Sequence, residues 1–416
     1  MATQAQPAPR DRRYEFTLLG LLTLGNGIVG FDRQTVAYLA PYIVADPEMA
    51  LTDAQLGWVA SALSLGIGLT AFFGSQYVDR TGTRKWLMVF CTLGFSILSG
   101  MSGLATSFAL LMLARFALGT FEGPIIPVGQ TLILHHSSPE RRGLNMGFMQ
   151  MVGAFGIAGT LGPIVATWLG ETVGWRNALF LSVLPGLLVA GAMALFMKPD
   201  PQQPAEATAA PRRSVMAEFG EVLKVANMRV NIGIAGLFTA WLVLMTTFLV
   251  IYLTANKGLE PLVAGGTMAM FGPAAAVGGV ALPWLSDRIG RKPVLVLGCL
   301  MGVVAPLLIV ALPGDPDLLK VAIFFGFLPL GIGPLYCATV PTESVRPALV
   351  TTAVGLTMGF AELFGGVVLP PVAGVLSDAF GREAIFYLSA ALALCATLVA
   401  LFLRETAPCK VAAKET

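Results

Sequence analysis

Five ionisable side chains stand within long apolar stretches of the sequence, where an unpaired charge is costly. They are Asp32, Arg33, Arg115, Glu122 and Glu362. A guanidinium is permanently charged and offers a fork of N–H donors that matches a carboxylate, so the two arginines could hold an organic anion. A carboxylic acid that is shielded from water can take up and release a proton near neutral pH. Residues of these types therefore indicate binding of an anion and a proton in one cavity.

The spacing brings four of these charges near one another. Asp32 and Arg33 lie near the middle of a predicted helix over residues 16–45. Arg115 and Glu122 are seven positions apart, which is two helical turns, so they share one face with about 10 Å between them along the axis. Packing of the two helices could bring both pairs together, and the sequence leaves open whether Asp32 pairs with Arg33 or with Arg115.

Such a cluster could couple two binding events through competition for one cation. When a carboxylate that is paired with an arginine takes up a proton, the arginine becomes free to bind the carboxylate of a substrate. The five side chains carry a formal charge of −1, which one proton or one cation would neutralise. No charged partner is evident for Glu362, which could contact substrate from the second half of the chain or reach toward water at the interface.

Glycines on the same segments predict close helix packing. Gly119 and Gly123 lie near the charged face of their helix, so we expect the first predicted helix to approach them closely. Gly25, Gly27 and Gly30 match the string of a dinucleotide-binding fingerprint. They lie inside an apolar helix with no preceding strand, and we interpret them as packing positions.

The composition shows which kind of element must position these side chains. Of the 416 residues, 56% are hydrophobic and 12% are charged, whereas soluble proteins carry about 25% charged residues. Charge this sparse indicates that lipid surrounds most of the chain. The net charge of +2 does not indicate nucleic acid, and the five cysteines show no paired spacing. The sequence has no P-loop and too few histidines for a metal site, so no cofactor or metal is expected.

Apolar stretches of about twenty residues or more predict membrane-spanning helices. Twelve are predicted, over residues 16–45, 53–78, 86–106, 108–134, 143–169, 176–197, 230–255, 261–286, 293–312, 318–341, 349–377 and 383–404. A polar segment over residues 198–229 divides them six and six, and it is predicted to be a linker followed by an amphipathic surface helix. The sequence therefore predicts an all-α membrane protein with one six-helix half over residues 1–197 and another over residues 230–416.

The distribution of basic residues predicts the orientation in the membrane. With the N-terminus inside, twenty Lys and Arg residues fall in inside segments and four in outside loops. Because basic residues favour the cytoplasmic side, both termini are predicted to be cytoplasmic. The short loops suggest a bacterial inner membrane, and we expect a multi-pass monomer in the lipid bilayer.

The two predicted halves share a loop motif. The sequence Asp-Arg-Thr-Gly-Thr-Arg-Lys at residues 79–85 is matched by Asp-Arg-Ile-Gly-Arg-Lys at residues 287–292, 208 positions later. This repeat resembles the loop signature of the major facilitator superfamily, whose layout is also six plus six helices. The resemblance implies two pseudo-symmetric halves, alternate access to a central site and a gating motif whose acid is expected to cap a helix end. The motif residues are Asp79, Arg80, Gly82, Arg84, Asp287, Arg288, Gly290 and Arg291.

A narrower resemblance concerns the first and fourth helices. Phe-Asp-Arg-Gln-Thr-Val and Ala-Pro-Tyr-Ile, within residues 31–43, are similar to helix 1 of the anion:cation symporter family, which includes sugar-acid transporters and other organic-anion carriers. The spacing of Arg115 and Glu122 resembles the fourth helix of that family. The resemblance implies that Asp32 and Glu122 carry protons, while Arg33 and Arg115 engage the anion.

Glu362 departs from that family, which often has Asn at this place in helix 11. A negative charge there suggests a substrate with hydroxyl or amine groups, or a different proton stoichiometry. Glu362 is therefore predicted both as a proton carrier and as a substrate contact. Tyr38 and Tyr252 are predicted to line the cavity.

These observations predict proton-coupled symport of an organic carboxylate by alternating access. The alternative within transporters is a proton-driven exporter, because Gly159, Gly162 and Pro163 match part of an exporter motif whose later glycine is Ala166 here. A membrane sensor would carry a soluble output domain, and an enzyme would show a nucleophile or a metal cluster. The sequence contains neither, so the protein is not expected to be an enzyme.

Overall fold

The computed structural model of the chain describes residues 12–81, 83–138, 141–199, 215–407 and 410. Within these ranges, twelve helical segments are long and apolar enough to cross a membrane. They cover Arg12–Ala45, Asp53–Ala71, Arg84–Leu104, Phe108–His136, Arg142–Val173, Trp175–Phe196, Ala226–Ala255, Pro261–Ile289, Arg291–Ala311, Pro316–Ser344, Val350–Phe380 and Glu383–Ala400. Each corresponds to one predicted span, so the prediction of a twelve-helix membrane protein is confirmed.

Two of the first six spans are single helices, α1 (Arg12–Ala45) and α2 (Asp53–Thr81). The third span is α3 (Arg84–Met101) with η1 (Ser102–Leu104), and the sixth is α8 (Trp175–Leu181) with α9 (Val183–Phe196). The fourth span is made of α4 (Phe108–Glu122) and α5 (Ile125–His136), and the fifth of α6 (Arg142–Gly147), η2 (Phe148–Ile157) and α7 (Ala158–Val173). The fourth span breaks at Gly123 and Pro124, because proline has no N–H group to continue the hydrogen-bond ladder. The interruption in the fifth span is π-helical η2.

Three of the second six spans are single helices and three are interrupted. A short helix, α10 (Val215–Lys224), precedes the continuous helices α11 (Ala226–Ala255), α14 (Arg291–Ala311) and α19 (Glu383–Ala400). The eighth span consists of α12 (Pro261–Met268) and α13 (Phe271–Ile289). The tenth consists of α15 (Pro316–Phe327), η4 (Leu328–Ile332), η5 (Leu335–Thr339) and α16 (Val340–Ser344). The eleventh follows η6 (Pro347–Leu349) and consists of α17 (Val350–Ala361), η7 (Glu362–Val368) and α18 (Leu369–Phe380). Segments η5 and η7 are π-helical, a distortion that is frequent at functional sites.

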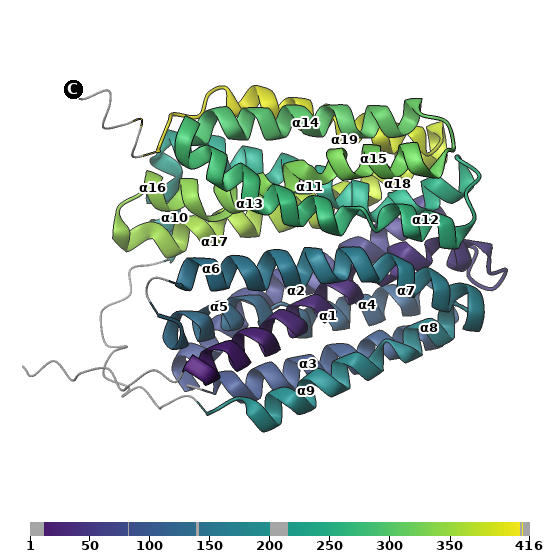
Figure 1. Cartoon of the computed structure of the whole chain (residues 1–416), viewed down its shortest axis with the longest axis horizontal. Coiled ribbons are helices and arrows are strands. Elements are labelled where there is room, and N and C mark those ends of the chain that lie inside the picture. The colour runs from purple at the N-terminus through teal and green to yellow at the C-terminus, as the bar shows by residue number, and fades with distance from the viewer. Residues whose placement is uncertain (1–11, 82, 139–140, 200–214, 408–409, 411–416) are drawn as a thin grey trace, which may run out of the picture.

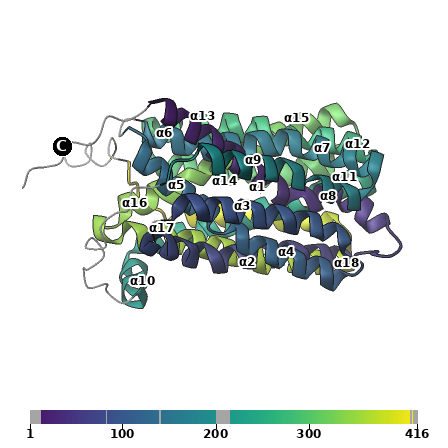
Figure 2. The same ribbon diagram turned by 90° about the horizontal axis from the view of Figure 1, so that it is seen from below.

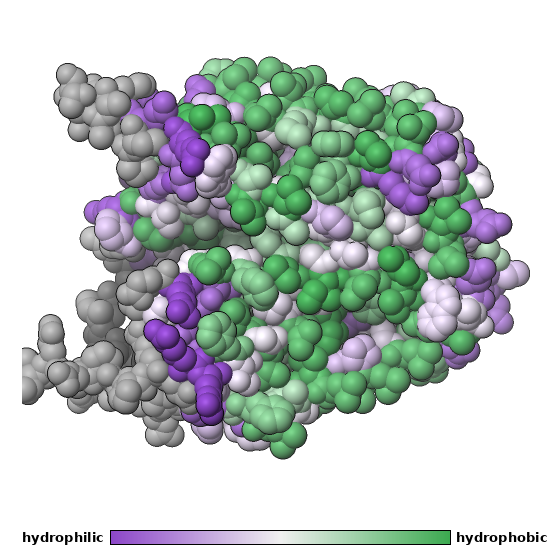
Figure 3. Space-filling model, in the orientation of Figure 1, coloured by the Kyte–Doolittle hydropathy of each residue, from purple (hydrophilic) through white to green (hydrophobic). Residues whose placement is uncertain are grey.

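The helices before and after residue 200 occupy different parts of the molecule. In Figure 1, α1 to α9 lie in the lower part and α11 to α19 in the upper part. Figure 2 brings α2 and α18 to the same edge, and these two helices pack against each other. Figure 3 shows apolar residues across the middle of the molecule and hydrophilic residues gathered at its two ends, as expected of a surface that faces lipid. The division into domains at residues 197 and 230 stays a prediction, and residues 200–214 of the predicted linker lie outside the described ranges.

The α2–α18 seam joins the two groups of helices at the end of the bundle where α1 finishes. Arg382 pairs with the carboxylate of Asp53, with Nε 3.0 Å from Oδ2, and Ser377 donates a hydrogen bond to the same carboxylate. Asp378 in turn accepts hydrogen bonds from the main-chain N–H groups of Asp53 and Ala54, at 3.0 and 3.1 Å. Each helix end at this seam is therefore held by an acid from the other group of helices.

Backbone atoms of α2 and α18 also lie in direct contact along the seam. A Cβ atom at Gly57 would clash with the carbonyl group of Pro370. A Cβ atom at Gly374 would clash with the carbonyl group of Asp53. The two main chains can approach this closely only because glycine has no side chain at either position.

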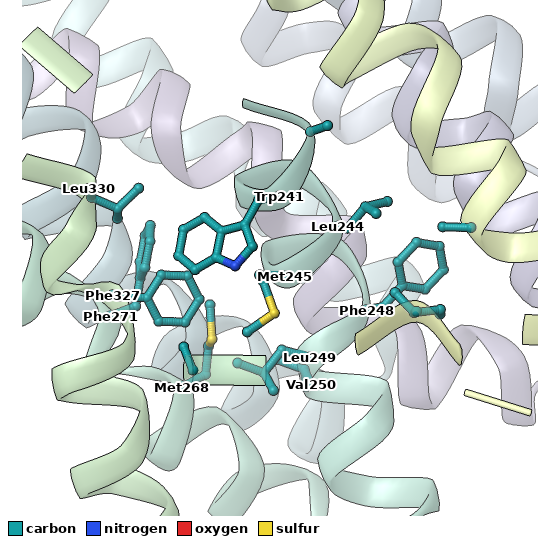
Figure 4. Packing of buried hydrophobic residues seen from close by; sticks show 14 of the residues in the cluster. Trp241, Leu244, Met245, Phe248, Leu249, Val250, Met268, Phe271, Phe327 and Leu330 are labelled. Atoms are coloured by element: carbon teal, nitrogen blue, oxygen red, sulfur yellow. The ribbon is translucent and has the colours of Figure 1, made fainter. Parts of the chain in front are cut away.

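An aromatic core lies within the second group of helices (Figure 4). Trp241 of α11 is fully buried. The ring centroids of Trp241 and Phe327 are 5.7 Å apart, and those of Phe271 and Phe327 are 4.9 Å apart. Buried aromatic rings contribute large apolar areas, so this cluster stabilises the packing of α11 against α13 and α15.

Candidate functional site

Arg33 of α1 lies between two carboxylates that come from different groups of helices. Its Nε atom donates a hydrogen bond of 3.3 Å to Glu122 Oε2, at the end of α4. Its Nη1 atom lies 3.7 Å from Glu362 Oε1, at the start of η7. The side chain of Glu122 is fully buried, whereas those of Arg33 and Glu362 are 28% and 30% exposed. Glu362 thus has a charged partner that was not evident in the sequence.

Local backbone structure places these three side chains at one depth in the bundle. Glu122 is the last residue of α4 because Pro124 ends its hydrogen-bond ladder. Glu362 opens the π-helical turn of η7, whose wider spacing shifts the direction of the side chains that follow. One turn before Arg33, α1 packs closely on η2, since a Cβ atom at Gly30 would contact the carbonyl group of Ala154. The glycine run in α1 is therefore a packing surface, as predicted.

Asp32 is buried beside Arg33 and its carboxylate contacts hydroxyl groups. Ser99 of α3 donates a hydrogen bond of 2.7 Å to Asp32 Oδ1. The Ser99 hydroxyl is also hydrogen-bonded to that of Ser182, between α8 and α9, at 2.9 Å. Within the described residues, Asp32 Oδ2 has no hydrogen-bond partner. The sequence left open whether Asp32 pairs with Arg33 or with Arg115. In the structure its carboxylate forms an ion pair with neither.

Arg115 is attached to α1 through the backbone. Its side chain is buried, and its Nη1 atom donates a hydrogen bond of 2.9 Å to the main-chain oxygen of Asp32. Its Nε and Nη2 atoms have no hydrogen-bond partner among the described residues. Because buried N–H groups are costly without an acceptor, these two atoms are suited to receive a carboxylate.

The packing of α4 differs from the expectation for its glycines. A Cβ atom at Gly119 would clash with the carbonyl group of Leu63, and one at Gly123 would clash with Thr70. Both contacts are on α2, so the expected close approach by α1 is wrong. The reason is that α2 contributes a matching glycine, Gly66, which meets the backbone of α4 in return. Small residues on both helices allow the closest approach.

A pocket lies beside these charges, between α1, α2, α4 and α11. It is lined by Arg33, Gln34, Val36, Ala37, Leu56, Val59, Ala60, Leu63, Arg115 and Thr247. Its charged lining residues are the two arginines, and most of the remaining wall is apolar. A few convergent polar groups in an apolar pocket are typical of sites for small organic ligands.

The sequence of the chain matches a known family along most of its length. A family model described as Major Facilitator Superfamily matches residues 22–366. The chain belongs to the Major Facilitator Superfamily. Members of this superfamily are membrane transporters and not enzymes, so the protein is a multi-pass membrane transporter.

Relatives of this transporter include carriers of organic acids. The cis,cis-muconate transport protein of Acinetobacter baylyi is 26% identical over 407 residues, which cover 94% of this chain and 93% of that protein. The D-galactonate transporter of Escherichia coli is 25% identical over 421 residues, which cover 92% and 93%. The crystal structure of a D-xylose-proton symporter shares the fold with a TM-score of 0.72 and 17% identity, covering 95% of this chain and 98% of that one.

The two tyrosines predicted to line the cavity of the transporter are both fully buried. Tyr38 lies on α1 and Tyr252 on α11, where its ring packs against that of Phe386 at 4.3 Å between centroids. Neither tyrosine is among the residues that line the pocket. Within the described residues, neither hydroxyl has a hydrogen-bond partner. A role for either tyrosine in binding substrate stays a prediction.

The second copy of the loop motif forms an ion cluster at the end of the bundle where α1 begins. Arg291 pairs with Asp287 and makes two contacts with Glu343, at 3.0 and 3.3 Å. Arg288 lies over the ring of the tryptophan one turn earlier, 3.8 Å from its centroid. Gly290 has a φ of 112°, which residues with a side chain rarely adopt. The motif therefore builds a tight turn between α13 and α14.

The carboxylate that caps α14 belongs to Glu405, in the segment after α19. It accepts hydrogen bonds from the main-chain N–H groups of Arg291 and Lys292, at 2.7 and 3.2 Å. The sequence predicted that the acid of the motif would cap a helix end. The turn at Gly290 instead brings the first N–H groups of α14 to the C-terminal segment, and the Asp287 carboxylate pairs with the Arg291 side chain.

Little of the first copy of the motif is described. Arg84 begins α3 and is buried. Gly82 and the side chains of Asp79 and Arg80 lie outside the described residues. A gating role for either copy stays a prediction.

Sequence reasoning missed Ser99 and Ser182. A single serine in an apolar span usually hydrogen-bonds a carbonyl group of its own helix, so it carries no signal by itself. Their hydroxyl groups meet only because α3 packs against α8 and α9. These serines could have been found only from the knowledge that their helices pack against the helix that carries Asp32. The sequence does not show which helices are neighbours.

Proposed function

We propose that this transporter is a proton-coupled symporter of an organic carboxylate anion, working by alternating access in the cytoplasmic membrane. The observation that carries the proposal is the ion pair between Arg33 and the fully buried Glu122. Two of the transporter's relatives are named as transporters of muconate and galactonate, which supports an organic acid as the substrate. The predicted proton carriers are Asp32, Glu122 and Glu362.

Coupling follows from the way in which Glu122 holds Arg33. A proton on Glu122 removes the negative charge that pairs with Arg33 Nε, and the guanidinium then lacks a partner on that side. Among the described residues, Arg33 then keeps only the longer contact of 3.7 Å with Glu362, and a substrate carboxylate binds to the freed donor in place of Glu122. The proton and the anion therefore bind together, and neither is favoured alone.

Arg115 supplies the second contact for the anion in this proposal. Its Nε and Nη2 atoms have no hydrogen-bond partner among the described residues, and Arg115 lines the same pocket as Arg33. Asp32 is a second site for a proton, and its carboxylate accepts a hydrogen bond from the Ser99 hydroxyl group. With both termini cytoplasmic, as the distribution of basic residues favours, the α2–α18 seam closes the outer end and must open for substrate to enter from outside. We further propose that the transporter works as a monomer.

The proposal is tested by uptake into proteoliposomes. A panel of labelled carboxylates is offered with and without an inward proton gradient, to the wild type and to Glu122→Gln. We expect one acid to accumulate only with the gradient. The variant should exchange that acid across the membrane but should not concentrate it, because its neutral amide cannot carry the proton.

The matched control is Glu260→Gln, the same substitution at an exposed position before α12. It should accumulate the acid as the wild type does. Uptake that ignores the gradient in the wild type would contradict proton coupling. Transport of no carboxylate at all would contradict the substrate class.

A further inference from the structure

We propose that the substrate carries a cationic amino or quaternary ammonium group beside its carboxylate, and that Glu362 binds this cationic group. The inference rests on the proposed function and adds the charge type of the substrate. It places the carboxylate of the substrate on Arg33 and Arg115, from the first group of helices. The cationic group lies on Glu362, from the second group.

The exposure of the five charges shows which of them a ligand meets. Asp32, Arg115 and Glu122 are each no more than 1% exposed. The side chains of Arg33 and Glu362 are 28% and 30% exposed. Arg33 and Glu362 are therefore the partly exposed pair of opposite charges, with Arg33 Nη1 3.7 Å from Glu362 Oε1. The pocket has two cations in its lining, Arg33 and Arg115, and a partly exposed anion, Glu362, beside Arg33.

A purely anionic ligand fits this pair poorly. When its carboxylate takes Arg33, Glu362 loses its cation and gains a second negative charge beside it. Like charges placed together in a site of low dielectric repel strongly. A zwitterion replaces both partners at once, because its carboxylate satisfies Arg33 and its ammonium group satisfies Glu362. It also leaves the net charge of the site unchanged.

The structure holds the Glu362 carboxylate in a defined place. Its Oε2 atom lies 3.0 Å from the position that a Cβ atom would take at Gly366, one turn later in η7. The Ser64 side chain of α2 lies against the same glycine. The carboxylate is therefore seated over a position without a side chain, at the boundary with α2. A fixed carboxylate at such a boundary is suited to recognise one end of a ligand.

The short distance in the Arg33–Glu362 pair also limits the length of the ligand. A substrate that inserts between Arg33 and Glu362 must carry its carboxylate and its cationic group close together. With bonds of about 1.5 Å, this favours about one to three carbon atoms between the carboxylate carbon and the nitrogen. Betaines and α- or β-amino acids have this spacing.

The test uses isosteric pairs of acids that differ only in the charge at one atom. Glycine betaine is paired with 3,3-dimethylbutyrate, and β-alanine with butyrate. Affinities are measured on the purified full chain by ligand-induced thermal stabilisation, for the wild type and for Glu362→Gln. We expect the wild type to bind the zwitterion of a pair about ten-fold or more tightly than its partner. We expect Glu362→Gln to lose or reverse this preference.

Two further variants keep the result interpretable. Glu362→Asp retains the charge and should keep a preference for the zwitterion, whereas a merely structural role would make it resemble Glu362→Gln. Glu383→Gln, at an exposed position at the start of α19, should bind as the wild type does. Equal or tighter binding of the plain acids by the wild type would overturn the inference. So would a preference that Glu362→Gln leaves unchanged.

Binding and uptake separate this inference from the proposed function. Affinity in detergent requires no proton gradient, so the charge preference is measured whether or not transport is coupled. A protein that prefers zwitterions but accumulates them without a gradient would keep this inference and lose the coupling. A protein that concentrates plain acids with a gradient, through an additional proton on Glu362, would do the reverse.

Discussion

Arg115 Nη1 donates a hydrogen bond of 2.9 Å to the main-chain oxygen of Asp32. A main-chain oxygen does not change its protonation, so this contact persists whichever carboxylate takes up a proton. Arg33 differs, because both of its ion-pair partners, Glu122 and Glu362, are carboxylates that can be neutralised. In the proposed mechanism, Arg115 is therefore the fixed anchor for the anion, and Arg33 is the cation that protonation releases.

Arg115→Lys should weaken binding of the substrate without abolishing the fold. Lysine keeps the charge but replaces a planar fork of donors with a single ammonium group. A charge-assisted hydrogen bond contributes about 1.5–3 kcal/mol, so we expect the Kd of the transported acid to rise about ten-fold or more. The Kd is measured by titration of the purified protein. Arg141→Lys, before α6, is the matched control, and an unchanged Kd in Arg115→Lys would contradict the anchor role.

Ser99→Ala should move the pH dependence of uptake. The Ser99 hydroxyl donates to Asp32 Oδ1, and such a bond favours the ionised carboxylate. Without it the balance between the ionised and the protonated form of Asp32 changes, so the pH of half-maximal uptake should shift by roughly half to one unit. Initial uptake rates are measured against external pH.

The control for Ser99→Ala is Ser96→Ala, one turn earlier on α3. The Ser96 hydroxyl donates to the carbonyl group of Thr92 in its own helix, so its removal should leave the pH profile in place. The same profile for Ser99→Ala and the wild type would show that Asp32 does not titrate during transport.

Arg382→Gln should favour opening of the α2–α18 seam. The substitution removes the ion pair with Asp53, which joins the two groups of helices. We expect several-fold faster labelling of a cysteine placed at Ala60, in the pocket, by a membrane-impermeant maleimide applied from outside, in a background without the five native cysteines. Asp317→Asn, which breaks a pair with Lys320 inside one helix, should not change the labelling rate. Slower labelling in Arg382→Gln would argue against a closing role.

Truncation after Arg404 should lower the stability of the protein. It removes Glu405, whose carboxylate caps the first N–H groups of α14. Loss of a helix cap costs about 0.5–2 kcal/mol, which should appear as a lower Tm in detergent. Truncation after Lys410 keeps Glu405 and should leave the Tm unchanged. Equal Tm values for the two truncations would mean that the cap is dispensable.

Periodicity and composition were sufficient to predict the twelve spans, because each depends only on the residues of one segment. The same holds for the five buried charges, since an acid or an arginine in an apolar run stands out without any knowledge of its neighbours. The spacing on the two helices also allowed the four charges Asp32, Arg33, Arg115 and Glu122 to come together, without naming Glu122 as the partner of Arg33. The contact of Arg33 with Glu122 at 3.3 Å agrees with that spacing.

Contacts that depend on which helices are neighbours could not be predicted. The pairing of Arg33 with Glu362 joins segments more than three hundred residues apart, and no local pattern encodes the register between them. The neighbour of Gly119 was predicted wrongly for the same reason. Its glycines indicate that another helix packs closely there, but the sequence does not show that this helix is α2. Asp53 and Arg382 looked like ordinary loop charges until the fold placed them side by side.

The main-chain contacts at Gly57 and Gly374 bear on how tightly the carrier prevents slippage. A gate made of long side chains can loosen one rotamer at a time and pass through partly open forms. Two backbones in direct contact have no rotamers to change, so α2 and α18 either lie together or separate along their length. In the proposed alternating-access mechanism, such a seam would make switching all-or-none and would leave no continuous path for solute from one face of the membrane to the other. If the proposed proton coupling holds, a carrier built in this way should dissipate little of the proton gradient.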